Sequence, residues 1–241
     1  MIHKRIILAL MALVTIFFVT EAKVYVVSVG IADYPGTKND LRLAANDAKV
    51  IRDLFKKNSD ASTVLLTNSE ATRENIITTM TNLYAHATQN DMVLLFFSGH
   101  GYPGGFVAYN GRLPYSDVRK AMANGRSKHK LIFADACYSG KIRNKKSSYN
   151  EDSEAKKADV LLFLSSRGNE KSYERKGWEN GIFTTFLDKG LRGYADSNRD
   201  RIITALELFR YVNSNVKNSV NGKQHPVMWG KFPDNLPIMK W

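Results

Sequence analysis

Cys137 and His100 are the two residues whose types and settings are best suited to chemistry. Cys137, the only cysteine of the chain, follows a short apolar run at 131–133 and a few small residues. His100 stands between two glycines, after the run 91–97, which is apolar beyond its first residue. A thiolate served by an imidazole is a nucleophile with its general base. Since the carboxyl ends of parallel strands share one sheet edge, where ligands bind, we expect the two side chains to meet there.

Each of these residues alone has an ordinary structural explanation. A single cysteine is usually a small buried hydrophobe, and a single histidine is usually a structural hydrogen-bonding group. The combination on two matching strand ends with glycine-bracketed tips favours a catalytic pair instead. The other four histidines lack such a setting: His3, His86, His129 and His225.

Two motifs carry a family resemblance. Residues 98–101 read Ser-Gly-His-Gly and residues 135–140 read Asp-Ala-Cys-Tyr-Ser-Gly. They resemble the catalytic motifs of the caspase-like clan of cysteine peptidases, with weaker support at 165–167 and 181–184. The acid two residues before the cysteine is similar to metacaspases and bacterial caspase-like proteins (orthocaspases), whereas animal caspases carry glutamine there. The resemblance implies an α/β fold, a three-layer caspase-like sandwich with a mostly parallel central sheet flanked by helices.

The resemblance also implies a mechanism for a cysteine-type endopeptidase. Cys137 attacks a peptide carbonyl as a thiolate, and His100 takes the thiol proton and later protonates the leaving amine. The backbone N–H groups of Gly101 and Cys137 stabilise the oxyanion. The sequence reveals no third residue that orients His100. No cofactor is required by this chemistry.

Two acidic residues predict the substrate preference. Asp135 is two residues before Cys137, so both side chains face the same side of the strand. Asp47 matches the Asn-Asp-Ala segment of metacaspases, where the corresponding acid lines the pocket for the residue before the cleaved bond. Two carboxylates in one pocket favour Arg or Lys by charge pairing. The alternative for Asp47 is an exposed residue of a helix.

Ser165 and Arg167 point toward a different preference. Their Ser-Ser-Arg segment resembles the caspase segment whose arginine recognises aspartate, so cleavage after acidic residues stays an alternative. Because two acidic residues outnumber one basic residue in this pocket, cleavage after basic residues is the prediction.

A caspase-fold binding or scaffold protein without catalysis is the other alternative. The intact pair of Cys137 and His100 argues against a scaffold, which has no use for both.

Composition and the amino-terminal segment bound the remaining possibilities. Residues 1–22 have basic residues, an apolar run at 6–19 and small residues near Ala22, the pattern of a signal peptide. The run is shorter than the roughly 20 residues of a membrane span, so we expect cleavage rather than anchoring. Residues 23–241 are then one exported peptidase domain, periplasmic or secreted, which acts on a peptide or protein.

The net charge of +12 comes from basic residues that are spread along the chain without interleaved aromatic residues, which argues against a specific nucleic-acid partner. The oligomeric state is left open.

Alternating apolar and amphipathic segments predict the elements of this domain. Strands and helices in alternation indicate a mostly parallel, doubly wound sheet. We expect strands at 24–31, 63–67, 91–97, 131–133, 159–165 and 227–229, a hairpin at 102–111, and helices at 41–57, from 72 onward, 115–123, 182–191 and 204–220.

A polar segment at 141–157 interrupts the alternation. It lacks periodicity, so we expect a mobile loop beside the nucleophile. Four basic residues near its start are of the type that the acidic pocket should accept: Lys141, Arg143, Lys145 and Lys146. The hypothesis is that the protein cuts itself within 141–146, and the alternative is a solvated loop that is never cut.

An acidic loop near the carboxyl end has two interpretations. Asp196, Asn198, Asp200 and Glu207 have the ligand spacing of an EF-hand-like calcium loop. Arg201 departs from the pattern, because the sharp turn there normally requires glycine. A turn followed by a capped helix explains the same residues, and both interpretations stay open.

Overall fold

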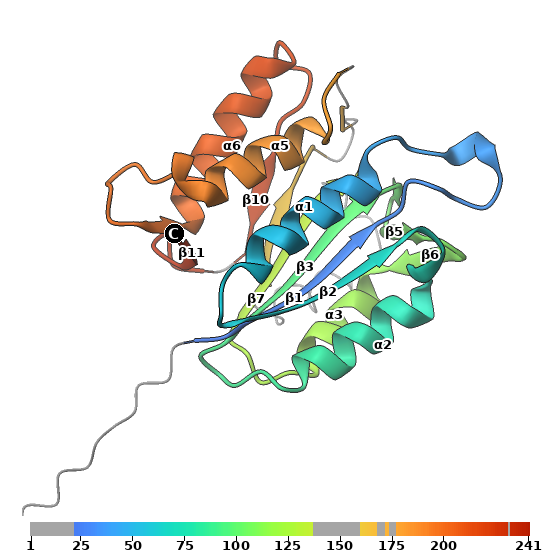
Figure 1. The fold of residues 1–241 in the computed structure, drawn as a ribbon, viewed down its shortest axis with the longest axis horizontal. Coiled ribbons are helices and arrows are strands. Elements are labelled where there is room, and N and C mark those ends of the chain that lie inside the picture. Colours follow the sequence, from blue (N-terminus) through green and yellow to red (C-terminus); the bar gives the residue numbers. More distant parts are fainter. Residues whose placement is uncertain (1–21, 137–159, 168–171, 174–176, 231) are drawn as a thin grey trace, which may run out of the picture.

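A six-stranded sheet forms the centre of the chain in the computed structural model, which describes residues 22–136, 160–167, 172–173, 177–230 and 232–241 (Figure 1). The strand order is β10-β8-β7-β3-β1-β2. The neighbours from β8 to β2 pair in parallel, and β10 joins the edge antiparallel to β8. The bounds are β1 Val24–Gly30, β2 Ala61–Thr67, β3 Met92–Gly99, β7 His129–Ala136, β8 Val160–Leu164 and β10 Val227–Trp229.

Helices cover both faces of this sheet. Figure 1 shows α2 (Arg73–Tyr84) and α3 (Tyr115–Ala123) on one face, and α1 (Ala44–Lys56), α5 (Ile182–Lys189) and α6 (Ala205–Ser219) on the other. Every residue of β3 is buried, as expected of a strand covered on both faces. Alternate strand residues join the two apolar clusters between the layers. The predicted α/β class and three-layer sandwich are confirmed.

Two predicted helix starts have the expected caps. The Oγ1 atom of Thr72 accepts a hydrogen bond from the backbone N–H of Asn75 at 3.2 Å, and α2 follows. Thr204 and Glu207 form a capping box at the start of α6. These caps satisfy backbone donors that a helix start otherwise leaves unpaired. The helix predicted at 41–57 is shorter than expected and begins at Ala44.

Two features differ from the sequence prediction. The segment predicted as a hairpin is a three-stranded antiparallel sheet of β4 (Gly101–Tyr102), β5 (Gly105–Ala108) and β6 (Gly111–Pro114). Near the carboxyl end, β9 (Ile202–Thr204) pairs with β11 (Pro237–Lys240). Strands this short have too few residues for a recognisable alternation of apolar and polar positions. They form because a partner strand pairs with them, which the local sequence does not show.

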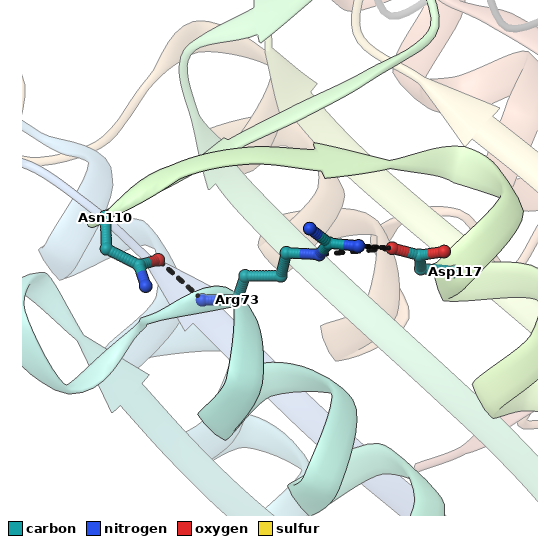
Figure 2. Close-up of polar contacts among 3 residues, drawn as sticks. All are labelled: Arg73, Asn110 and Asp117. Atoms are coloured by element: carbon teal, nitrogen blue, oxygen red, sulfur yellow. Dashed lines mark hydrogen bonds and ion pairs between the residues drawn. The ribbon is translucent and has the colours of Figure 1, made fainter.

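The small β4–β6 sheet is fastened to the helices below it. The backbone N–H of Arg73 donates to Asn110 Oδ1 at 2.9 Å, and its guanidinium group pairs with Asp117 at 2.6 Å (Figure 2). Asn110 also donates to Glu74 Oε2 at 2.7 Å. Asn110 thereby holds the turn between β5 and β6 against the first turn of α2, and the Arg73–Asp117 pair joins α2 to the first turn of α3.

Several predictions fall on residues that the structure does not describe. They are the leader up to residue 21, Cys137 itself, and the segment 141–157. Within the described residues, none of the helices has the length and apolarity needed to cross a membrane.

Candidate active site

The carboxyl ends of β3 and β7 meet at one edge of the sheet. The parallel register places Ser98 opposite Asp135 and Gly99 opposite Ala136. His100 is the residue directly after β3, and Gly101 then opens β4. Cys137 is the residue directly after β7 in the sequence and lies outside the described residues. The predicted adjacency of the two strands is confirmed.

The imidazole of His100 is oriented by a backbone carbonyl. Its Nε2 atom lies 2.7 Å from the carbonyl oxygen of Asn39, in the loop between β1 and α1. A carbonyl oxygen only accepts, so Nε2 carries the proton and Nδ1 is the basic nitrogen of the neutral ring. Sequence reasoning missed this orienting group, because any residue type supplies a backbone carbonyl.

Asp47 and Asp135 come together at the same edge. Their side chains are buried, with exposed fractions of 3% and 6% for the residues. A Cβ atom on Gly181 would lie 2.5 Å from Asp135 Oδ2 and 3.2 Å from Asp47 Oδ2, so both carboxylates converge on the place where Gly181 has no side chain. The interpretation of Asp47 as an exposed helix residue is wrong, since its face of α1 packs on the sheet.

Neutral donors hold the carboxylate of Asp47. Oδ1 accepts from the backbone N–H of Gly181 and from Asn180 Nδ2, both at 2.9 Å, and Oδ2 accepts from Ser98 Oγ at 2.8 Å. Burial raises the pKa of Asp47 to about 8, and the negative charge of Asp135 acts in the same direction. The three hydrogen bonds offset only part of this increase in pKa.

A buried polar network supports Asp135. Its Oδ2 atom accepts from Thr184 Oγ1 at 2.8 Å and from the Thr184 backbone N–H at 3.2 Å, and its Oδ1 atom accepts from Ser172 Oγ. The fully buried Gln224 donates to Ser172 Oγ at 3.3 Å and to the carbonyl oxygen of Ser165 at 2.9 Å. Gln224 escaped sequence reasoning because it belongs to no local motif and approaches only in the folded chain.

Ser165 and Arg167 differ in their surroundings. The Oγ atom of the buried Ser165 lies 3.2 Å from the backbone nitrogen of Ala136 and 3.3 Å from its carbonyl oxygen. This side chain therefore ties the end of β7 to the end of β8. Arg167 follows β8 and is exposed. Of the four predicted substrate-binding residues, Asp47 and Asp135 are the two whose carboxylates both lie beside Gly181.

The acidic loop at 196–207 uses its side chains to build a turn. Carboxylate oxygens of Asp196 and Asp200 accept backbone N–H groups within the loop, and Glu207 accepts from Ser197 and from the Thr204 cap. Arg201 has a φ of 65°, the left-handed turn where the calcium motif has glycine. Among the described residues, no group of three or more His, Cys, Asp or Glu is arranged to hold a metal ion. The donor types suit calcium, but their hydrogen bonds to the loop and to the helix cap fit the interpretation of a turn followed by a capped helix better.

Comparisons with known proteins agree with this architecture. The family model described as "Caspase domain" matches residues 23–236. The fold is similar to caspase-1 from Spodoptera frugiperda, with a TM-score of 0.65 and 17% identity over 91% of this chain and 90% of that one. It is also similar to a protein from Geobacter sulfurreducens, with a TM-score of 0.63 and 16% identity over 90% and 97% of the two chains. No curated protein matches the sequence. At these identities the structural likeness concerns the fold.

Proposed function

The chain belongs to the caspase-domain family, and from this premise we propose that it is a cysteine endopeptidase with a Cys137–His100 dyad. The observation that carries the proposal is the register of β3 and β7. It pairs Gly99 with Ala136, the residues directly before the two members of the dyad. A caspase fold that had lost catalysis would have no reason to keep a thiol and an oriented imidazole at adjacent strand ends.

The orientation of His100 suits a general base. With Nε2 bonded to Asn39, Nδ1 is the nitrogen that takes the proton of the Cys137 thiol. The thiolate attacks the peptide carbonyl, and the N–H groups of Gly101 and Cys137 stabilise the oxyanion. The imidazolium then protonates the leaving amine, and water hydrolyses the thioester.

We further infer that the enzyme cleaves after Arg or Lys. The convergence of Asp47 and Asp135 beside Gly181 supports this preference, since a guanidinium group forms two parallel hydrogen bonds with carboxylates. Burial and mutual repulsion make two ionised carboxylates unfavourable in the empty site. A cationic side chain relieves both penalties, and an acidic one adds to them.

Active-site labelling tests class and preference together. An arginyl chloromethyl ketone should label Cys137 stoichiometrically, whereas the matched aspartyl reagent should not. Cys137→Ala should abolish labelling and peptidase activity while the variant stays folded, with a circular dichroism spectrum like that of the wild type. Labelling by the aspartyl reagent alone would establish the acidic preference, and labelling by neither would favour a binding or scaffold protein.

We also propose that residues 1–22 are removed on export to the periplasm or the medium, and that the chain cuts itself within 141–146. The composition of these two segments supports both steps. Intact mass spectrometry of wild-type and Cys137→Ala protein after incubation separates them. Loss of residues 1–22 should occur in both proteins, and the internal cut only in the wild type. A wild-type chain that stays whole while cleaving an arginyl peptide would exclude self-processing and leave the peptidase assignment standing.

A further inference from the structure

The hydroxyl group of Tyr34 lies between the backbones of His100 and Val107. The His100 N–H donates to Tyr34 Oη at 3.0 Å, and Tyr34 donates to the carbonyl oxygen of Val107 at 3.1 Å. On the other side of this pair, the Val107 N–H donates directly to the His100 carbonyl at 2.9 Å. The hydroxyl group is therefore a relay in a ring of backbone hydrogen bonds.

Strand register explains why this relay is unusual. Gly101 pairs with Phe106 in the antiparallel ladder of β4 and β5, so His100 and Val107 face each other as the next pair. Residues of a hydrogen-bonded antiparallel pair exchange two direct N–H to carbonyl bonds. Here one of the two bonds runs through a tyrosine oxygen. The ladder is opened on the side of the His100 N–H, and the path of the chain through His100 depends on the inserted hydroxyl.

The surroundings keep this hydroxyl in place and protonated. A Cβ atom on Gly99 would lie 2.8 Å from Tyr34 Oη, so the glycine before His100 makes room for the oxygen. Tyr34 is 5% exposed, and burial raises its pKa to about 12. At neutral pH the oxygen can therefore accept from His100 and donate to Val107 at the same time.

The same loop also touches the imidazole itself. The Tyr34 ring lies 4.9 Å from the His100 ring, centroid to centroid, at an angle of 40°. The Asn39 carbonyl, five residues later, holds Nε2. The Tyr34 N–H donates to Asp40 Oδ1 at 3.1 Å, which joins these two parts of the loop. The loop after β1 thus contacts His100 at its backbone, its ring face and its ring nitrogen.

We propose that Tyr34 is a positioning residue for His100, and that its hydroxyl group sets the placement of the imidazole relative to the Cys137 thiol. This inference rests on the proposed peptidase function. Tyr34 touches neither substrate nor the reacting atoms, and it acts by fixing the backbone from which the general base projects. Misplacing a general base by a fraction of an ångström weakens proton transfer without removing the substrate pocket.

The test compares Tyr34→Phe, which keeps the ring and removes only the hydroxyl group, with the removal of another buried tyrosine hydroxyl group that lies away from His100. Tyr84 is fully buried and donates to the Leu94 carbonyl at 2.7 Å within the core, so Tyr84→Phe is the control. In Tyr34→Phe, kcat for an arginyl peptide should fall about 10- to 100-fold with KM little changed. Tyr84→Phe should lower the melting temperature and leave kcat close to that of the wild type.

A second measurement reports on the dyad without requiring peptidase activity. Cys137 is the only thiol of the chain, so its alkylation rate by iodoacetamide, followed against pH, reports how strongly His100 stabilises the thiolate. Tyr34→Phe should move the inflection upward, toward the value of about 8.5 for an unpaired thiol. A profile that coincides with those of the wild type and Tyr84→Phe would overturn the inference, whatever the activity. A shifted profile in a protein that cleaves no peptide would uphold the positioning role and contradict the proposed peptidase function.

Discussion

Two groups of acidic residues in this protein have opposite surroundings. Asp47 and Asp135 are brought together from α1 and β7 and are 3% and 6% exposed. Asp196, Asp200 and Glu207 come from one short stretch of sequence, and their carboxylates cap an exposed turn and the helix after it. The first group meets only through the fold, and the second is assembled locally.

These surroundings shift the pKa values of the carboxyl groups in opposite directions. Burial raises the pKa of Asp47 to about 8, with the nearby charge of Asp135 adding to the effect. At Glu207 the small burial also acts upward, but hydrogen bonds from Ser197 and Thr204 outweigh it and lower the pKa. Buried carboxylates resist ionisation until a cation binds beside them. Solvent-exposed carboxylates in a turn are ionised, and in that form they stabilise the turn by accepting hydrogen bonds. This contrast leads to four predictions.

The largest expected effect is on catalysis and separates the two groups. Asp135→Asn should lower kcat/KM for an arginyl peptide about 100-fold, since losing one partner of a desolvated charge pair costs several kcal/mol. Asp200→Asn, the same chemical change in the exposed turn, should leave kcat/KM unchanged. Steady-state kinetics of both variants measures this. Equal effects at the two positions would remove Asp135 from the substrate pocket.

The second effect concerns stability against pH. The folded-state pKa of Asp47 lies above its unfolded value of 3.8, so the folded state holds more protons between these two values. Linkage then makes the free energy of unfolding fall as pH rises from about 4 to about 8. Asp47→Asn removes this dependence and should be the more stable protein near pH 8. Melting temperatures of both proteins across this range test the sign, and a wild type that gains stability relative to the variant with rising pH would contradict it.

Glu207 should show a smaller effect of the opposite sign. Its folded-state pKa is depressed, so its contribution is present above the ordinary value of 4.5 and is lost as pH falls through the folded pKa. Glu207→Gln should cost about 1 kcal/mol at pH 7, the usual contribution of a helix cap. The cost should disappear in acid. Urea unfolding at pH 7 and pH 3 measures it, with the exposed Glu70→Gln as a control that changes little.

The smallest expected effect is that of calcium on stability. The carboxylates of Asp196, Asp200 and Glu207 already accept hydrogen bonds from the loop and the cap, and a cation would have to displace them. We therefore expect millimolar calcium to leave the melting temperature unchanged. A rise in the wild type that Asp196→Asn abolishes would show that the loop rearranges into a calcium site.

Local signals explain the parts of the fold that sequence predicted well. Thr72 with Asn75, and Thr204 with Glu207, cap their helices because a capping contact spans only three residues. The buried strands β1, β3 and β7 were found because a strand covered on both faces must be apolar along its length. The pairings of β9 with β11 and of β4 with β5 were missed, since strands this short have no periodicity.

In the candidate site too, residues within local motifs were identified from the sequence, and residues that act between distant segments were not. His100 and Asp135 were identified from sequence because their neighbours form compact motifs. Tyr34, Asn39 and Gln224 were not, because each acts through a few hydrogen bonds between distant segments, most of them to or from backbone groups. Such contacts put almost no constraint on neighbouring residue types.

The amino-acid sequence by itself determined the apolar strands, the caps and the chemical types available at the sheet edge. These depend on residue identity and on spacings of a few positions, which the sequence states directly. Only the tertiary structure decided that Asp47 is buried against Asp135, that Asn39 orients His100, and that the hydroxyl of Tyr34 enters the ladder beside it. Burial and hydrogen-bond partners belong to pairs of distant segments, and their free energies exist only once the chain has brought those segments together.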